Sequence, residues 1–214
     1  MWKLYPWGGF GANPMPRRFQ RFWDSAKSVL KGGMPYSEGI YEDISKIQCV
    51  GYYWNPEKDY KEILEEYIRY EYDPKVCDMV LEMMECIENN HEAVGTGKEP
   101  TYEYAKRAAE LAKLADSKLG IRAKKAWRWR ILYIRAILDE KRYEYYESHG
   151  MQGQEDLITL RRFGGDFLAE DVEAQELFRE LRQIYHCVEY NRENQYTLPP
   201  LGGNTVFGNA PGTE

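Results

Sequence analysis

The chain has 214 residues, which suits one large domain or two small ones. Apolar residues make up 43% and charged residues 30%, so the composition supports a packed core and excludes wholesale disorder. The net charge of −6 argues against a general nucleic-acid binder, and no run approaches the roughly 18 to 20 apolar residues that span a bilayer. We therefore expect neither a nucleic-acid partner nor a membrane partner, and the composition leaves the cellular compartment open.

The aromatic residues are consistent with ligand binding, whereas the cysteines and histidines argue against a metal site. Aromatic residues reach 14%, a level typical of proteins that handle sugars or flat ligands, although a plain aromatic core explains it equally well. The cysteines and histidines show no metal-ligand spacing, so no metal or other cofactor is expected. These residues are Cys49, Cys77, Cys86, Cys187, His91, His149 and His186.

Residues 1–50 differ from the rest of the chain. Residues 8–16 are rich in Gly and Pro and predict a loop. A helix is expected over 17–30, where the apolar residues have helical spacing, and Gly32-Gly33 ends it. A second loop or short strand follows at 34–39.

From Ile40 to Tyr190 the apolar spacing is helical almost throughout, which predicts an α-helical array without a sheet. The α-helical domain is expected over 51–190. Asp73 and Thr101 are expected to cap helices. The expected helices run over 59–72, 74–90, 101–119, 122–147, 156–162 and 170–190. Residues 191–214 have no helical period and predict an extended or disordered tail.

The segment 122–142 is basic with interleaved aromatic residues, which in isolation indicates RNA binding or a membrane-surface helix. A core helix with internal ion pairs is the simpler interpretation. It predicts that Trp127, Ile131, Ile134 and Leu138 are buried. It also predicts that Arg128, Arg135 and Arg142 pair with acids of the same chain, for which Glu62, Glu65 and Glu66 are candidates. A second acidic set, Glu82, Glu85 and Glu88, is expected on a solvated face.

Glu38 combines several features of a catalytic carboxylate. It follows the loop residue Tyr36 and stands just before an expected helix start, where the helix dipole favours the ionised form. An aromatic, Gly-rich loop over 5–16 precedes it. Taken alone, these features are equally consistent with a simple helix cap.

At these residues the sequence resembles glycoside hydrolases. Gly8-Gly9-Phe10-Gly11, a helix, and then Ser37-Glu38-Gly39-Ile40 are similar in order to the late barrel segments of α-N-acetylglucosaminidases, where a Pro-Glu-Gly motif carries the nucleophile. Here Pro35 stands three residues before Glu38 instead of directly ahead of it. The segment 36–44 and Tyr53-Trp54-Asn55-Pro56 also resemble uncharacterised bacterial glycoside-hydrolase-like proteins with an all-helical C-terminal region.

The resemblance implies that Glu38 is catalytic and that Trp7, Asn13 and Tyr36 face a sugar. It further implies that residues 1–50 are a short remnant of the last strand–helix elements of a (β/α)₈ barrel, a fold of about 250 residues. Because glycoside hydrolysis needs two carboxylates, the chain is expected to be an inactive C-terminal fragment that meets carbohydrate through a missing N-terminal barrel. The alternative is a helical structural or interaction module without a catalytic site, in which the first residues are only a linker.

Overall fold

The computed structural model describes residues 11–30, 32–36, 39–93, 101–149 and 166–190, and all regular structure in these ranges is helical. The elements are α1 (Pro16–Ala26), η1 (Ile40–Glu42), α2 (Asp43–Trp54), α3 (Tyr60–Glu71), η2 (Pro74–Val76), α4 (Cys77–Ala93), α5 (Tyr102–Lys118), α6 (Ile121–Lys125), α7 (Trp127–Ser148), α9 (Asp166–Glu170) and α10 (Val172–Tyr190). No strand occurs in the described ranges, which confirms the mainly helical class there. The helix expected at 156–162 and the tail at 191–214 lie outside them.

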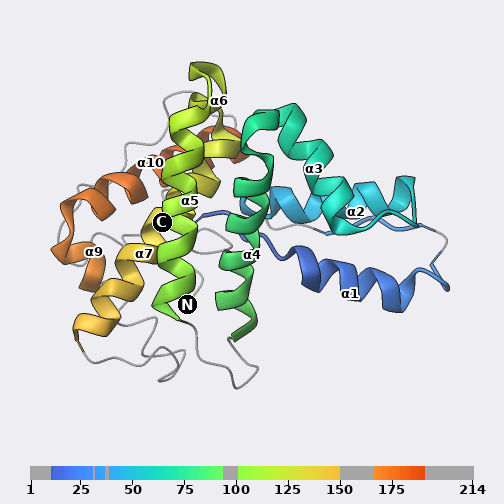
Figure 1. Ribbon diagram of the computed structural model, residues 1–214, viewed down its shortest axis with the longest axis horizontal. Helices are drawn as coiled ribbons and strands as arrows, with labels where there is room; N and C mark the ends of the chain where they lie inside the picture. Colours follow the sequence, from blue (N-terminus) through green and yellow to red (C-terminus); the bar gives the residue numbers. More distant parts are fainter. Residues whose placement is uncertain (1–10, 31, 37–38, 94–100, 150–165, 191–214) are drawn as a thin grey trace.

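Helices α4, α5 and α7 form a bundle at the centre of the molecule, with α5 packed between its two neighbours (Figure 1). Small side chains on α5, such as Ala108 and Ala112, are fully buried and let the neighbouring helices approach closely. Met83 of α4 and Trp129 of α7 fill the space on either side. The indole Nε1 of Trp129 donates to Asp116 Oδ1 at 2.9 Å, so the one polar atom of this buried ring is satisfied.

The side-chain caps expected at Asp73 and Thr101 are confirmed, and a further cap lies at Asp59. The Asp73 carboxylate accepts the backbone N–H of Lys75 at 2.9 Å. The Asp59 carboxylate accepts the backbone N–H of Glu62 at 2.9 Å, and the Glu62 carboxylate accepts the backbone N–H of Asp59, which forms a capping box before α3. Thr101 accepts the backbone N–H of Tyr104 before α5. These bonds satisfy first-turn N–H groups that have no partner within the helix.

The helix expected over 122–147 is two helices, because Ala126 is extended (φ −66°, ψ 134°) and separates α6 from α7. No residue of α6 is fully buried, although the half-buried Ala123 packs against the core. The predicted burial of Trp127 is wrong: Trp127 is half-buried beside Arg128, and Trp129 enters the core instead. The predicted burial of the other stripe residues is confirmed for Ile131, Ile134 and Leu138.

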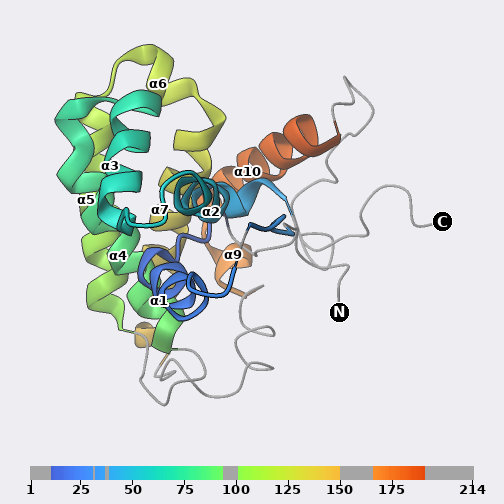
Figure 2. The ribbon, with the colours of Figure 1, turned by 90° about the vertical axis from the view of Figure 1, so that its right-hand side faces the viewer.

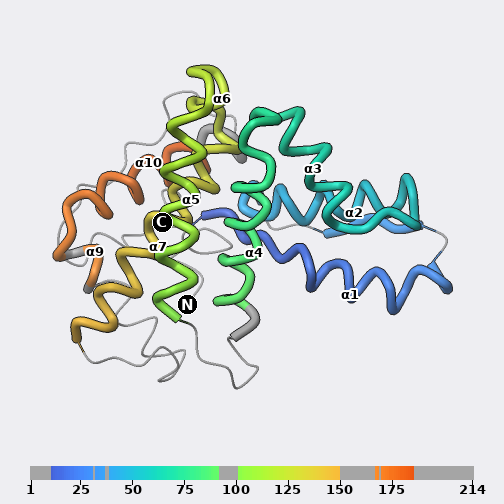
Figure 3. The backbone as a smooth tube through the Cα atoms, viewed as in Figure 1, coloured from blue at the N-terminus to red at the C-terminus, as the bar shows by residue number. Residues whose placement is uncertain are grey.

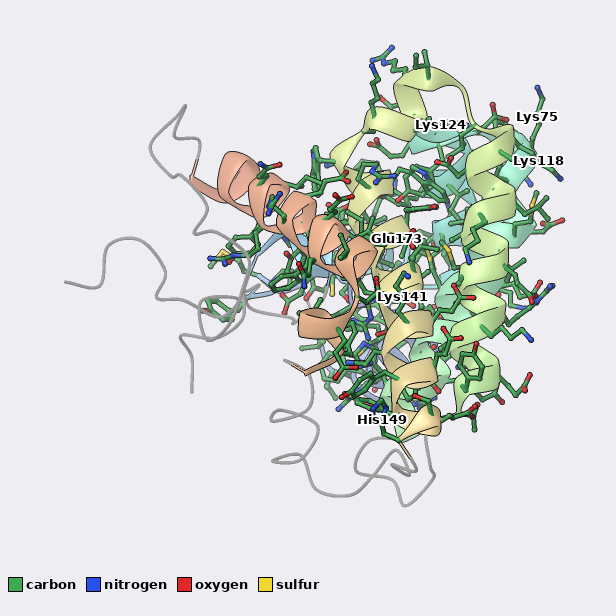
Figure 4. All side chains as sticks on the ribbon, turned by 90° about the vertical axis from the view of Figure 1, so that its left-hand side faces the viewer. Lys75, Lys118, Lys124, Lys141, His149 and Glu173 are labelled. Carbon is green, nitrogen blue, oxygen red and sulfur yellow. The ribbon has the colours of Figure 1, made fainter. Side chains whose placement is uncertain are left out.

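The last expected helix, 170–190, is confirmed as α10, and a short helix that was not expected, α9, precedes it. Asp171 separates α9 from α10, and its carboxylate accepts the backbone N–H of Ala174 at 2.9 Å, which caps α10. Lys141 of α7 pairs with Asp171 at 2.9 Å and with Glu173 at 2.8 Å. Figure 4 shows Lys141 and Glu173 on the neighbouring helices that this pair connects. The capping carboxylate therefore also fixes α10 against α7.

The described residues of 16–54 form an arm that extends away from the bundle (Figure 1). The arm consists of α1, the returning segment (the described residues 32–36), η1 and α2. Figure 2 looks along α1 and α2 and shows them next to each other. Trp23 of α1 stacks on Tyr52 of α2 with ring centres 5.4 Å apart, and its Nε1 donates to the Pro56 carbonyl at 3.0 Å. Helix α1 ends at Ala26, earlier than the expected Leu30, because no described residue of 27–30 is buried to hold a further turn.

A strap of three residues, Gly11–Asn13, connects the arm to the bundle, and Figure 3 shows this blue start of the described chain running toward α7. The Ala12 N–H donates to the Ile131 carbonyl at 3.3 Å, and the Asn13 N–H donates to the Tyr41 carbonyl at 2.8 Å. Gly11 has φ +127°, and a Cβ there would lie 2.8 Å from the Ile131 oxygen. Glycine is therefore required where the strap lies against α7.

Candidate ligand-binding groove

A buried polar network anchors the strap. Arg135 of α7 donates through Nη1 to the Ala12 carbonyl at 3.2 Å and to the Asn13 side-chain oxygen. Its Nε pairs with Asp139 at 2.7 Å, and Arg142 pairs with the same carboxylate at 2.8 Å. Burial by itself would raise the pKa of Asp139, but the two guanidinium groups hold that pKa below its ordinary value. The strap is thus hydrogen-bonded to Arg135, whose charge is balanced inside the molecule by Asp139.

His91 completes this network on the side of α4. Arg135 Nη2 lies 2.9 Å from His91 Nε2, and because a guanidinium can only donate, Nε2 must be the acceptor of a neutral ring. Burial, together with the nearby charge of Arg135, lowers the pKa of His91 to about 3. The proton of the neutral ring is therefore on Nδ1.

Glu88 of α4 positions the first turn of α1. Its carboxylate accepts the backbone N–H of Arg17 at 3.1 Å, the backbone N–H of Arg18 at 2.8 Å and the Arg17 Nε at 2.8 Å. The side chain of Glu88 is fully buried, so the predicted solvated face is wrong at this residue. Its neighbours also have partners: Glu82 pairs with Arg107, and Glu85 accepts the Tyr60 hydroxyl.

A groove of about 490 Å³ lies between α1, the strap, the returning segment and the start of α2. The side of the groove made by α1 is a helical stripe at i, i+3, i+4 and i+7, formed by Met15, Arg18, Phe19 and Phe22. Phe22 is 62% exposed, so its ring remains available to a ligand. The α1 side of the groove is therefore apolar with one cationic group.

The opposite side of the groove is more polar. Asn13 from the strap, Glu42 from η1 and Ser45 from α2 line it, and Tyr36 of the returning segment adds an aromatic ring that is 84% exposed. Asn13 and Ser45 are themselves buried, and Asn13 is held by Arg135. The groove thus combines aromatic rings with an amide, a hydroxyl, a carboxylate and a guanidinium.

Two of the predicted site residues, Asn13 and Tyr36, meet in this groove although 23 positions separate them. The other two, Trp7 and Glu38, lie outside the described residues. The sequence prediction missed Arg18, Phe22 and Glu42. The helical spacing of Met15, Arg18 and Phe22 could have indicated that they share one face. The same spacing is typical of any helix with a buried face, so it does not identify a groove.

The arginines of α7 pair with acids of the same chain, as predicted. Arg128 pairs with Asp43 at 3.1 Å and with Glu71, and both Arg135 and Arg142 pair with Asp139. The predicted acidic helix is confirmed for Arg128, because Glu71 belongs to α3. The three acids named in advance were wrong, because they serve other residues. Glu62 belongs to the capping box, Glu65 pairs with Arg69, and Glu66 pairs with Lys58.

Within the part of the chain that the structure describes, no group of three or more His, Cys, Asp and Glu side chains is arranged to hold a metal ion. Cys77 and Cys86 share α4 as expected, and both are free thiols, as is Cys49. Each helix of the described ranges is too short or too polar to cross a bilayer. Comparison with protein families, curated proteins and solved structures finds no match for the chain.

Proposed function

We propose that the chain is the helical C-terminal part of a glycoside-hydrolase-like enzyme and that its groove holds part of a carbohydrate ligand. The observation that supports this proposal most is the meeting of Asn13 and Tyr36, two residues with an implied sugar contact, beside the aromatic stripe of α1. In this proposal, residues 1–50 are a short remnant of the last strand–helix elements of a (β/α)₈ barrel, and the rest of the barrel supplies the rest of the substrate site.

The size and chemistry of the groove suit a saccharide. A volume of about 490 Å³ lies in the range of about 300 to 1,000 Å³ that is common for ligand pockets. A sugar ring has apolar C–H faces and hydroxyl edges, so it needs both flat apolar surfaces and hydrogen-bonding groups. Phe22 and Tyr36 offer the first, and Asn13, Glu42 and Ser45 offer the second.

Catalysis is assigned to the whole enzyme and not to this chain alone. Hydrolysis by the usual route needs two carboxylates about 5 to 9.5 Å apart. Among the described residues of the groove, Glu42 is the one carboxylate. Glu38 remains the proposed catalytic residue, and its partner is proposed to lie on the barrel. The chain alone should therefore bind sugar without cleaving it.

A second candidate function, a protein-interaction module, has an observation of its own. The arm exposes large apolar side chains, among which Met34 is 95% exposed and Trp54 is 91% exposed. Val29 and Val50 are also exposed. Apolar surface of this kind is a common feature of protein contact sites. On this alternative, the arm binds another protein and the groove binds no sugar.

Calorimetric titration of the purified chain with a panel of mono- and disaccharides tests the proposal. We expect binding that weakens about tenfold in Phe22→Ala, because stacking on an exposed ring is lost. Tyr70→Ala is the matched control, since Tyr70 is an exposed aromatic residue of α3 outside the groove. Absence of binding to every saccharide would favour the interaction module.

Activity assays separate the catalytic part of the proposal. The chain alone should not hydrolyse aryl glycosides, whereas a version extended at its N-terminus to include the barrel should do so. Glu38→Gln in the extended protein should lower the rate by about 10² to 10⁴. Turnover by the short chain, or full activity of the Glu38→Gln variant, would contradict the assignment.

A further inference from the structure

We infer that the groove selects a saccharide that carries a carboxylate, such as a uronic acid, and that Arg18 binds this group. The inference rests on the proposed function, because it names the class of sugar that the same groove takes. Arg18 lines the groove between Met15 and Phe22 on α1, so its guanidinium lies beside the surface on which a sugar ring would stack.

Arg18 differs from the other arginines around the strap in having no acidic partner among the described residues. Arg17 pairs with Glu88, and Arg135 and Arg142 pair with Asp139. The guanidinium of Arg18 instead has a sulfur contact, from Nη1 to Met15 Sδ at 3.8 Å. Internal ion pairs account for the charges of Arg17, Arg135 and Arg142, whereas the charge of Arg18 is available to a ligand.

The backbone of Arg18 is held in place while its side chain stays exposed. Glu88, which is fully buried, accepts the Arg18 N–H at 2.8 Å and so fixes the first turn of α1. Proline at the start of the same turn restricts it further. The Cα of Arg18 is therefore preorganised, and binding an anion requires ordering of the side chain alone.

The other charged group of the groove sets the orientation of the ligand. Glu42 lies on the side of η1, across from the stripe of α1. A carboxylate accepts hydrogen bonds from sugar hydroxyls but repels a second carboxylate. The sugar would therefore place its acidic group toward Arg18 and its hydroxyl edge toward Glu42 and Ser45. Arginine suits the first role because its planar fork matches a carboxylate with two parallel hydrogen bonds.

Paired titrations test the inference. Calorimetry compares a glucuronic-acid disaccharide with the neutral glucose disaccharide of the same linkage, for the unmodified chain, for Arg18→Gln and for Lys61→Gln. Lys61 is an exposed cation of α3, so its loss changes the net charge equally without touching the groove. We expect the acidic sugar to bind more tightly, and Arg18→Gln to weaken it about 10- to 100-fold. The neutral sugar should change less than about twofold, and Lys61→Gln should change neither.

Three other outcomes would contradict the inference, and they show separately whether the proposed function also fails. Equal affinity for the two sugars, unchanged in Arg18→Gln, would overturn the inference and leave the proposed function intact. Absence of binding to both sugars would overturn the proposed function and the inference with it. Inorganic sulfate added alone is the last probe: if it binds as tightly as the acidic disaccharide, Arg18 is a simple anion site and the assigned sugar class is wrong.

Discussion

The bundle and the arm are both built from helices with aromatic residues, but they use these residues in opposite ways. In the bundle, Trp129 is fully buried and bonded to Asp116, whereas in the arm Trp54 is almost fully exposed at the end of α2. Helix α7 contacts α5, α6, α9 and α10, whereas Trp54 is the last residue of α2, a helix that contacts α1, α3 and η1. Helical spacing determines which residues share a face, and the neighbouring helices determine whether that face is buried.

The largest expected effect contrasts these two tryptophans. Trp129→Ala should lower the free energy of unfolding by about 3 to 5 kcal/mol, because it leaves a cavity in the bundle and removes the hydrogen bond from the indole to Asp116. Trp54→Ala should change it by less than about 0.5 kcal/mol, because the ring is in solvent. Urea denaturation of both variants measures the difference. Similar losses would mean that the end of the arm is covered in solution, and the contrast would fail.

Two glycines with positive φ allow the backbone of the bundle contact to be compared with the backbone of the arm. Gly11 (φ +127°) lies against α7, whereas Gly32 (φ +153°), in the arm, has nothing within 4 Å of an added Cβ. Gly11→Ala should lower the free energy of unfolding by about 3 kcal/mol, from backbone strain plus the clash with Ile131. Gly32→Ala has the strain alone and should cost about 1 kcal/mol. Equal losses in urea denaturation would show that the strap is not pressed against α7.

The smallest effect is a pH dependence that the bundle should have through His91. The folded pKa of about 3 lies below the ordinary value of 6.5, so only the unfolded chain takes up this proton between those values. The resulting stability is present above pH 6.5 and is lost as the pH falls toward 3. Between pH 7 and pH 5 the loss should be about 2 kcal/mol.

His91→Gln isolates this contribution, because glutamine can accept a hydrogen bond from Arg135 but does not titrate. Urea denaturation at pH 7 and pH 5 should show a pH dependence about 2 kcal/mol smaller in the variant than in the unmodified chain. The same pH dependence in both proteins would mean that His91 is charged or solvated when folded.

The sequence alone predicted most of the helices, because caps and breakers act locally. Asp73 and Thr101 start helices with their own side chains, and no distant contact is needed to identify them. The break at Ala126 could not be predicted, since alanine is a good helix former and neither glycine nor proline stands at the break. The predicted stripe included Trp127, whereas Trp129, two residues further along α7, enters the core.

Glu88 shows why a regular charge spacing was misleading. Residues three apart advance about 300° around a helix, so two such steps displace Glu88 by about 120° from Glu82. One of these acids pairs on the exposed surface with Arg107, and the other is buried under α1. Which side a second helix covers is a property of the fold and not of the spacing.

The candidate site was predictable only in part, because the groove also depends on which segments lie opposite each other in the fold. Asn13 and Tyr36 were identified as sugar-facing through a resemblance in the surrounding motif. Arg18 and Glu42 look like ordinary surface charges in the sequence, and they become groove residues only because the returning segment and η1 lie opposite α1. Such an arrangement depends on contacts between segments that are distant in the chain.

The strap has a consequence for synthesis of the protein on the ribosome. Asn13 is bound by Arg135, which is 122 residues further along the chain. At translation rates of about 5 to 20 residues per second, the strap emerges about 6 to 24 s before the helix that holds it. During that interval the buried face of α5 lacks α7, one of the two helices that it packs against. We therefore expect nascent chains arrested before α7 to be more dependent on chaperones than chains arrested after it.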